Sequence, residues 1–300
     1  MKMYKSLVAA SIISAVAAPV AADPTLYGKV NVTVQNSDDG TESKTELKSN
    51  ASRLGVKGEY ELDGGLSVIY KYEFQVDVTD ESGEQNIKSR NQYIGLRGAF
   101  GEVILGRNDT VLKQSQGKFD IYSDQEADIK KLWSGENRMS DSITYKTPEI
   151  NNFQFGVSYI IDEDNDDSAT SMSLTYGDSG LKKTEYYAAI AMDNEVKGYD
   201  VTRLTVGTKI SGVVIGAMYQ SQEEVETGED KSGFMLSAKY KVGDYSLNGQ
   251  FQTIEDDSGF TLGADRKLGK NTTAFAYYTT FNFDMDEDES YLAIGLEQKF

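Results

Sequence analysis

Apolar and polar residues alternate along most of the chain from residue 24 onward. In Phe153–Tyr159 every second residue is apolar and the residues between are small or polar, and 68–76, 234–240 and 245–251 follow the same pattern. A period of two predicts β-strands with one apolar and one polar face, whereas an amphipathic helix has a period of about 3.6. The pattern therefore predicts an all-β protein with about 16 strands, at 24–35, 51–61, 66–78, 89–99, 102–107, 140–147, 152–161, 169–177, 181–191, 200–209, 213–221, 231–241, 245–254, 258–267, 272–281 and 289–300.

The predicted strands are joined by short turns that alternate with longer, acidic connections. Turn residues occupy 63–65 and 243–244, and 162–168 and 282–288 are examples of the longer connections. A tilted strand of ~9–11 residues crosses the hydrocarbon of a bilayer, and the sheet must close because lipid cannot satisfy an open edge. We therefore predict a transmembrane antiparallel up-and-down β-barrel. A soluble β-sandwich or propeller also has alternating strands and is the alternative fold.

Residues 1–22 have the features of a secretory signal peptide. Lys2 and Lys5 precede an uncharged, mostly apolar run from Leu7 to Ala18, and the small residues at 20–22 offer a cleavage site. A membrane anchor would need about 18 or more apolar residues. We predict that cleavage leaves a single domain, residues 23–300, which forms the barrel.

The composition excludes several classes of function. The 300 residues include no Cys and no His, so a disulfide framework, a zinc–thiolate site, a Cys–His pair and a Ser-His-Asp triad are all excluded. The formal net charge of -18 repels nucleic acid, and we expect no polynucleotide partner. We predict no enzymatic activity, no metal site and no cofactor. Weak calcium binding by acidic connections such as 162–167 is an alternative to simple solvation, although this segment lacks the central Gly and distal Glu of an EF-hand loop.

The last predicted strand ends on an aromatic residue. Leu292, Ile294 and Leu296 alternate with small or polar residues and lead to the terminal Phe300. This arrangement resembles the signal that the outer-membrane barrel-assembly machinery reads, although Gln298 stands where that signal usually has an apolar residue. Together with the signal peptide, it predicts a location in the outer membrane of a Gram-negative bacterium, with outer-membrane lipids, lipopolysaccharide and the barrel-assembly machinery as partners.

Several segments resemble the general-diffusion porins of Gram-negative outer membranes. The resemblance is densest over 24–160 and returns in the last strand; its segments are Thr25–Val32, Ser52–Leu66, Arg90–Gly98, Gly101–Arg107 and Asp141–Pro148. It implies a 16-stranded barrel that is usually a homotrimer. It also implies that the third long loop folds into the pore, where basic residues of the wall face acidic residues of the loop at a constriction.

Residues 108–139 form the predicted constriction loop. They contain no clean strand alternation, and loops longer than about 12–15 residues are usually functional or disordered. Phe119, Tyr122 and Trp133 indicate a packed loop. An inward fold rests mainly on the resemblance, a loop folded over the barrel mouth is the alternative, and the Pro-Glu-Phe-Gly type of tip found in such loops is missing. The predicted constriction acids are Asp109, Asp120, Asp124 and Glu126.

The basic wall of the constriction is predicted from strand parity and from the porin motifs. Arg53 and Lys57 alternate with apolar residues and therefore face the lumen, and Arg138 faces it by extension of the strand that follows. Arg90 and Arg107 match wall arginines in the motifs, but Arg107 shares the parity of its apolar neighbours, so that a bulge or a strand end is needed to bring it inside. The predicted wall is Arg53, Lys57, Arg90, Arg107 and Arg138.

The predicted function is passive diffusion of ions and small hydrophilic solutes through a water-filled pore, with selectivity set by the charged constriction. Two alternatives keep the barrel. One is a solute-specific channel, for which Phe119, Tyr122 and Trp133 would form a short aromatic track. The other is an adhesion or structural protein that binds through its acidic outer loops, and a liposome-swelling assay separates it from a pore.

The acidic excess is concentrated in four short windows. Residues 162–167, 223–230, 255–257 and 284–289 contain 18 acidic residues and no Lys or Arg. We expect all four windows to lie in long connections at the cell-exterior end. The net charge of the whole chain is therefore a poor guide to the charge of the constriction.

Overall fold

β-Strands make up most of the structure. The computed structural model describes residues 24–79, 86–161 and 168–300, so the predicted signal peptide and the acidic window 162–167 lie outside the described residues. The helical segments described are α1 (Val111–Ser115) and two 3-10 turns, Asp63–Gly65 and Ile129–Lys131, and none is long and apolar enough to cross a membrane. The strands are β1 (Thr25–Asp38), β2 (Ser43–Ser49), β3 (Arg53–Glu61), β4 (Ser67–Val76), β5 (Ile87–Gly98), β6 (Gly101–Asp109), β7 (Arg138–Lys146), β8 (Phe153–Ile160), β9 (Ala169–Tyr176), β10 (Tyr186–Val196), β11 (Tyr199–Ile210), β12 (Val213–Glu224), β13 (Glu229–Val242), β14 (Tyr245–Ile254), β15 (Asp257–Lys267), β16 (Thr272–Asn282) and β17 (Glu289–Lys299).

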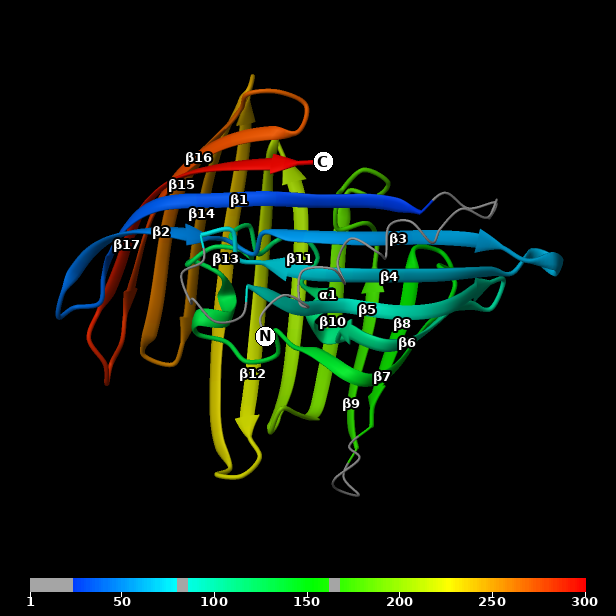
Figure 1. Cartoon of the computed structure of the whole chain (residues 1–300). Helices are drawn as coiled ribbons and strands as arrows, with labels where there is room; N and C mark the ends of the chain where they lie inside the picture. Colours follow the sequence, from blue (N-terminus) through cyan, green and yellow to red (C-terminus); the bar gives the residue numbers. More distant parts are fainter. Residues whose placement is uncertain (1–23, 80–85, 162–167) are drawn as a thin grey trace, which may run out of the picture.

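All these strands belong to one antiparallel sheet that closes into a barrel (Figure 1). From β3 to β17 each strand pairs with the next along the chain, and β1 closes the sheet by pairing with β17. The second half of β1 pairs with β2 and its first half with β3, so β2 and β3 together form one strand of the wall. The 17 segments therefore build a 16-stranded barrel, which confirms the predicted fold class.

The wall beside β1 differs from the sequence-based expectation. The pattern predicts a connection over 36–50, whereas residues 43–49 form β2 and β1 itself continues to Asp38. The sequence of β2, SKTELKS, lacks an apolar face, and most of its side chains are exposed. Pairing with β1 holds this polar segment in the sheet, and a kink at Ala51, whose φ is 49°, separates it from β3.

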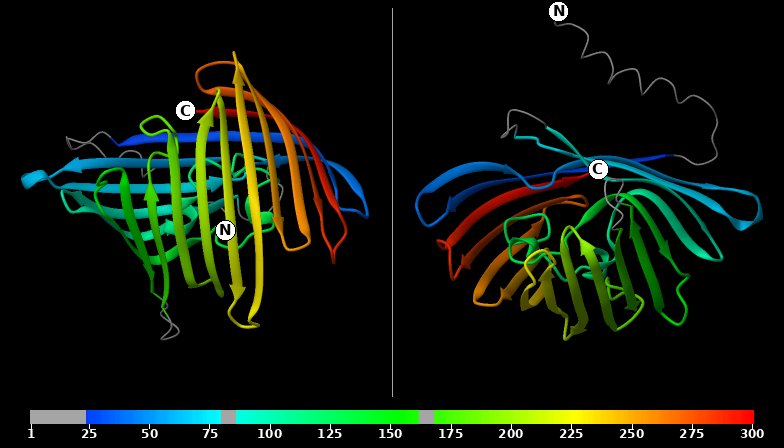
Figure 2. Two further views of the ribbon diagram at one scale, coloured as in Figure 1. Left: turned by 180° about the vertical axis from the view of Figure 1, so that it is seen from behind. Right: turned by 90° about the horizontal axis from the view of Figure 1, so that it is seen from below.

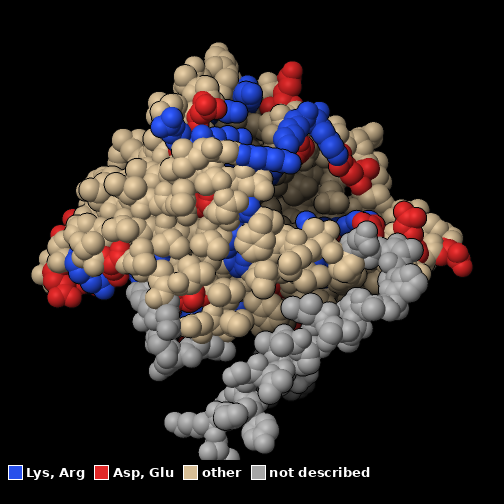
Figure 3. Space-filling view, turned by 45° about the horizontal axis from the view of Figure 1, so that its top comes forward, with Lys and Arg blue, Asp and Glu red and all other residues tan. Residues whose placement is uncertain are grey.

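The two faces of the wall have opposite polarity. On β1, Leu26, Val30 and Val34 point outward and are exposed, whereas Thr33 and Gln35 are buried inside the barrel. The parity repeats round the sheet and leaves broad uncharged areas on the outer surface, with charged side chains gathered at their margins and around a hollow (Figure 3). An apolar outer belt over a polar interior is the pattern of a barrel that stands in lipid.

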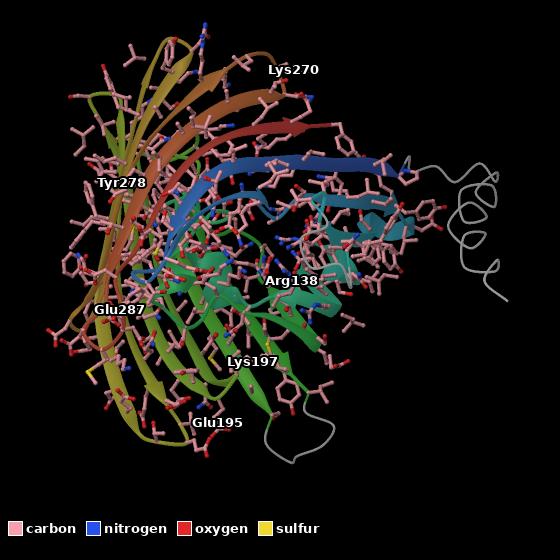
Figure 4. The ribbon with its side chains drawn as sticks, turned by 60° about the vertical axis from the view of Figure 1, so that its left-hand side comes forward. Arg138, Glu195, Lys197, Lys270, Tyr278 and Glu287 are labelled. Carbon is pink, nitrogen blue, oxygen red and sulfur yellow. The ribbon has the colours of Figure 1, made fainter. Side chains whose placement is uncertain are left out.

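The two ends of the barrel carry different connections. Lys270 lies at one end, and Glu195, Lys197 and Glu287 lie toward the other (Figure 4). The end that carries Glu195 also carries the segments 39–42, 225–228, 255–256 and 283–288. We call it the outer end, following the expectation that the acidic connections face the cell exterior.

Two of the three acidic windows within the described residues are not the long connections that the sequence suggests. β12 continues to Glu224 and β13 begins at Glu229, so only 225–228 connect them, and Glu255 and Asp256 alone join β14 to β15. The expectation is met at 283–288, between β16 and β17. The strands are longer than their apolar stretches, and acidic side chains therefore stand on the strand ends as well as in the turns.

The segment between β6 and β7, residues 110–137, lies inside the barrel (Figure 2). It begins with α1, which contacts β8, β9 and β10. The hydroxyl of Thr110 caps this helix by accepting a hydrogen bond from the Lys113 backbone. We refer to residues 110–137 as the inner loop.

Candidate functional site

Apolar contacts hold the inner loop against one side of the barrel. Phe119, Ile129 and Trp133 are buried against β10 to β14, and Met218 and Met235 belong to the same cluster. The indole of Trp133 donates a hydrogen bond to the carbonyl of Thr253 at 2.7 Å. These side chains pack the loop onto the wall, so the aromatic track suggested for a solute-specific channel is not exposed to the lumen.

Glycines of the wall make room for the aromatic side chains of the inner loop. Gly207 and Gly216 are paired neighbours on β11 and β12. A Cβ at Gly207 would lie 1.9 Å from Phe119 Cζ, and a Cβ at Gly216 would lie 2.6 Å from Phe119 Cβ. On the neighbouring part of the wall, Tyr122 lies over Gly263 in the same way. Backbone close approach explains why glycine stands inside these strands.

The tip of the inner loop crosses the lumen to the opposite wall. The carboxylate of Asp124 accepts hydrogen bonds from Arg53 Nη2 at 2.6 Å to each oxygen, and from Lys29 Nζ at 2.6 Å. Burial opposes ionisation of Asp124, but the charges of Arg53 and Lys29 outweigh it and lower its pKa to about 2. Glu126 follows two residues later and accepts a hydrogen bond from Gln35 on β1. We refer to Asp124, Arg53 and Lys29 as the tip clasp.

A β-bulge brings Arg90 to the inner face. The pairing between β4 and β5 shifts by one residue at Glu73, so that both Arg90 and Asn91 oppose it. Arg90 Nε donates to Glu73 at 2.8 Å, and the hydroxyl of Tyr27 donates to the other carboxylate oxygen at 2.8 Å. Lys71 Nζ lies 3.3 Å from the same group. Arg90 is therefore in the lumen, with its charge matched by a buried carboxylate of the wall.

Arg138 also lies in the interior of the barrel (Figure 4). Its Nη2 lies 2.9 Å from Asp109 Oδ1 and its Nε donates to Asn91 Oδ1 at 2.7 Å. Asn91 in turn donates to Asp109 Oδ2 at 3.0 Å, and Lys113 Nζ lies 3.6 Å from Asp109. The predicted pair of a wall arginine and a loop acid is thus in contact at the base of the inner loop.

Arg107 does not face the lumen, and the prediction that placed it in the basic wall is wrong. It pairs with Gln92, which pairs with Tyr72, and Tyr72 is 54% exposed on the outer face. Directly opposed residues of an antiparallel pair share a face. Arg107 Nη1 donates to Ser140 Oγ at 2.8 Å. The bulge that interrupts β6 and β7 follows Gly106 and leaves Arg107 outside.

Two other predicted residues lie away from the constriction. Lys57 occupies β3 four positions nearer to the turn end than Arg53, with its Nζ 5.3 Å from the centre of the Tyr27 ring. Asp120 is buried, and its carboxylate accepts hydrogen bonds from Gln250 and from the backbone of the inner loop. Burial raises the pKa of Asp120, as does the nearby charge of Asp128. Asp120 therefore serves the packing of the loop rather than the lining of the pore.

A polar cavity of about 990 Å³ lies between the inner loop and the wall formed by β2 to β5. Its lining brings together Arg90 and Arg138 from the strands with Asp124, Glu126 and Glu136 from the loop. Seven Lys or Arg residues and five Asp or Glu residues line it, although the whole chain has 30 basic against 48 acidic residues. The charged residues of the lining are Lys48, Lys88, Arg90, Lys113, Lys130, Lys131, Arg138, Asp77, Asp124, Glu126, Asp128 and Glu136.

Several residues of this site were not predicted. Lys29 and Glu73 have the correct parity for the lumen, but no local pattern indicates which ions they pair with. Asn91 enters only through the bulge. Glu136 lies within the predicted constriction loop, but no sequence pattern distinguishes it as a residue of the site. Among the described residues no group of three or more Asp or Glu side chains could hold a metal ion.

Comparison with known proteins identifies the family. A family model described as Gram-negative porin matches residues 9–286. The chain belongs to the Gram-negative porin family. The major outer membrane protein P.IB of Neisseria meningitidis is 28% identical to this porin over 251 residues, which cover 77% of this chain and 74% of the relative.

Solved structures show the same fold as this porin. An anion-selective porin from Comamonas acidovorans has a TM-score of 0.75 at 21% identity and covers 93% of this chain and 100% of its own. A trimer form of OmpT from Vibrio cholerae has a TM-score of 0.61 at 15% identity and covers 93% of this chain and 99% of its own. The protein is therefore an outer-membrane porin, whose barrel is a channel for passive diffusion of solutes.

Proposed function

We propose that the constriction of this porin favours small hydrophilic anions over cations and that the protein catalyses no reaction. The observation that carries the proposal is the excess of basic residues in the cavity lining, seven against five, inside a chain with a net charge of -18. Charges at the narrowest point dominate selectivity, because charges farther away than about 10 Å are largely screened at 0.1 M salt. The Comamonas acidovorans porin, which is anion-selective, has the same fold and supports this proposal.

Replacing Arg53 and Arg90 with glutamine should shift the preference toward cations. Each substitution leaves a carboxylate, Asp124 or Glu73, without its nearest guanidinium. Reversal potentials in planar bilayers under a salt gradient measure the effect, and the double variant should shift by more than either single one. Wild-type protein that prefers cations would refute the proposed selectivity, and an unchanged reversal potential in both variants would remove these residues from the constriction.

We further propose that the porin functions as a homotrimer. Gln92, Arg107 and Ser140 form a polar patch on the outer face of β5 to β7, where lipid would make an exposed Arg unfavourable by ~2–4 kcal/mol at the bilayer midplane. A second copy of the chain would cover the patch, and the trimer form of Vibrio cholerae OmpT supports this assembly.

The charge reversal Arg107→Glu should therefore weaken the trimer. Arg266→Glu is a matched control, because Arg266 stands on the outer face of β15, on the far side of the barrel, over the ring of Tyr245. Size-exclusion chromatography in mild detergent and unheated gel electrophoresis measure the trimer fraction. A trimer fraction that falls equally in both variants, or in neither, would place the interface elsewhere, and wild-type protein that elutes as a monomer would reject the homotrimer.

A further inference from the structure

Arg203 is a buried arginine on the inner face of β11, on the side of the barrel opposite the tip clasp. Its side chain is 0% exposed and is the largest fully buried side chain among the described residues. The guanidinium nevertheless has partners on all three nitrogens. Nε donates to Gln220 at 2.7 Å, Nη1 to Glu136 at 2.6 Å and Nη2 to the carbonyl of Ser134 at 3.3 Å.

Two of these partners, Ser134 and Glu136, belong to the descending limb of the inner loop, residues 133–137, and Gln220 lies on β12. The guanidinium carbon of Arg203 lies 5.7 Å from the centre of the Trp133 ring, and the backbone N–H of Ser134 donates to Gln222 on the neighbouring strand at 3.0 Å. The limb leads directly into Arg138, the first residue of β7. Arg203 therefore fixes the part of the inner loop that precedes a residue of the constriction.

Arg203 also determines how much charge Glu136 presents to the pore. Glu136 lines the cavity together with Lys113 and Arg138, and Lys113 Nζ donates to the Glu136 carbonyl at 3.2 Å. The carboxylate of Glu136, however, is turned toward Arg203, which forms an ion pair with it from the wall behind the cavity lining. A buried ion pair that loses one partner leaves an uncompensated charge, so loss of Arg203 would add a negative charge to a lining that is otherwise basic.

We propose that Arg203 is a positioning residue for ion selection: it never contacts the permeating solute, but it holds the limb 133–137 in place and neutralises Glu136. This proposal takes the anion preference proposed above as its starting point. Its test depends only on the differences in reversal potential between the variants and the wild type. A unit charge 4 Å from an ion in bulk water alters the equilibrium occupancy of that ion by about fivefold, so a several-fold change in the permeability ratio is expected.

Three variants separate the two parts of this role in single-channel recordings. Arg203→Gln should shift the reversal potential toward cations and increase open-channel current noise. Glu136→Gln should shift the reversal potential in the opposite direction. The double variant should return the reversal potential toward the wild-type value while the noise stays high, since charge is balanced again but the limb is still loose.

Arg203→Lys completes the test, because it keeps the charge and loses the planar fork of donors. It should keep the wild-type reversal potential and show intermediate noise. If Arg203→Gln fails to fold, Glu136→Gln and Arg203→Lys still decide the question. The proposal would be overturned if Arg203→Gln and Glu136→Gln both had the wild-type reversal potential. If Arg203→Gln does not fold, a wild-type reversal potential in Glu136→Gln alone would overturn it. A wild-type protein without anion preference would instead reject only the proposed selectivity.

Discussion

Replacing Asp124 by asparagine is expected to raise both the conductance of the pore and its preference for anions. Asparagine has nearly the same shape but no charge, so Arg53 and Lys29 lose the carboxylate that each contacts at 2.6 Å. The tip of the inner loop would be held to the opposite wall by weaker contacts. One net positive charge would be added at the point where the loop crosses the lumen. Because a unit charge at 4 Å in bulk water alters the occupancy of each ion by about fivefold, the ratio of anion to cation permeability should rise several-fold.

Asp286→Asn is the matched control for Asp124→Asn. It makes the same change of charge at an exposed position of the connection 283–288, at the outer rim. Reversal potential and conductance should change little in this variant, particularly at 0.1 M salt or above, where exposed charges are screened. Equal shifts in the two variants would show that the field of the acidic rim, rather than the constriction, sets selectivity.

The substitution Gly207→Ala is expected to displace the inner loop from the barrel wall against which it packs. The added Cβ would lie 1.9 Å from Phe119 Cζ, so either the ring or the wall must move. Overpacking of this kind typically costs about 1–3 kcal/mol. Gly207→Ala should therefore lower the temperature at which the folded band disappears in semi-native gel electrophoresis, and it should broaden the distribution of single-channel conductances.

The second substitution Phe119→Ala should relieve the clash. The double variant should regain a narrow distribution of conductances relative to Gly207→Ala, although it lacks the packing of the ring. Gly249→Ala serves as a control, since the nearest side-chain atom to its added Cβ would be Leu262 Cδ2 at 3.4 Å, an ordinary contact. If Gly207→Ala and Gly249→Ala have the same thermal stability and the same conductance distribution, close packing of Phe119 on Gly207 does not hold the loop in place.

Strand parity predicts which residues face the lumen wherever pairing is regular. Arg53 is an example, because the alternation in β3 is uninterrupted and the side chain points to the inner face. Parity fails at the bulge in β5, where Arg90 is inside because two residues oppose Glu73. For Arg107 parity is right and the motif is wrong, since this residue lies on the outer face with its apolar neighbours. Bulges depend on the pairing of two strands, and a single strand's sequence does not specify them.

Local sequence patterns do not predict which charged residues form ion pairs with one another. Arg53 and Asp124 are 71 residues apart in the chain, and Arg203 and Glu136 are 67 apart. Barrel closure and the path of the inner loop bring them together. The sequence does contain a signal for the part of the wall against which the loop packs, because Gly207 and Gly216 interrupt strands in which glycine is otherwise unfavourable. The signal indicates that another group approaches the backbone closely, but it does not identify that group as Phe119.

The shortness of the outer hairpins has a consequence for what the cell surface offers to other molecules. Between β10 and β15 the outer connections are 197–198, 225–228 and 255–256, and hydrogen-bonded strands run right up to them. Proteases need extended, accessible chain and find little of it there. These turns are also the places where a foreign peptide could be inserted with least disturbance, because exposed loop tips tolerate insertions best. The same compactness makes this barrel a scaffold for peptide display, with the guest sequence at the rim and the constriction untouched.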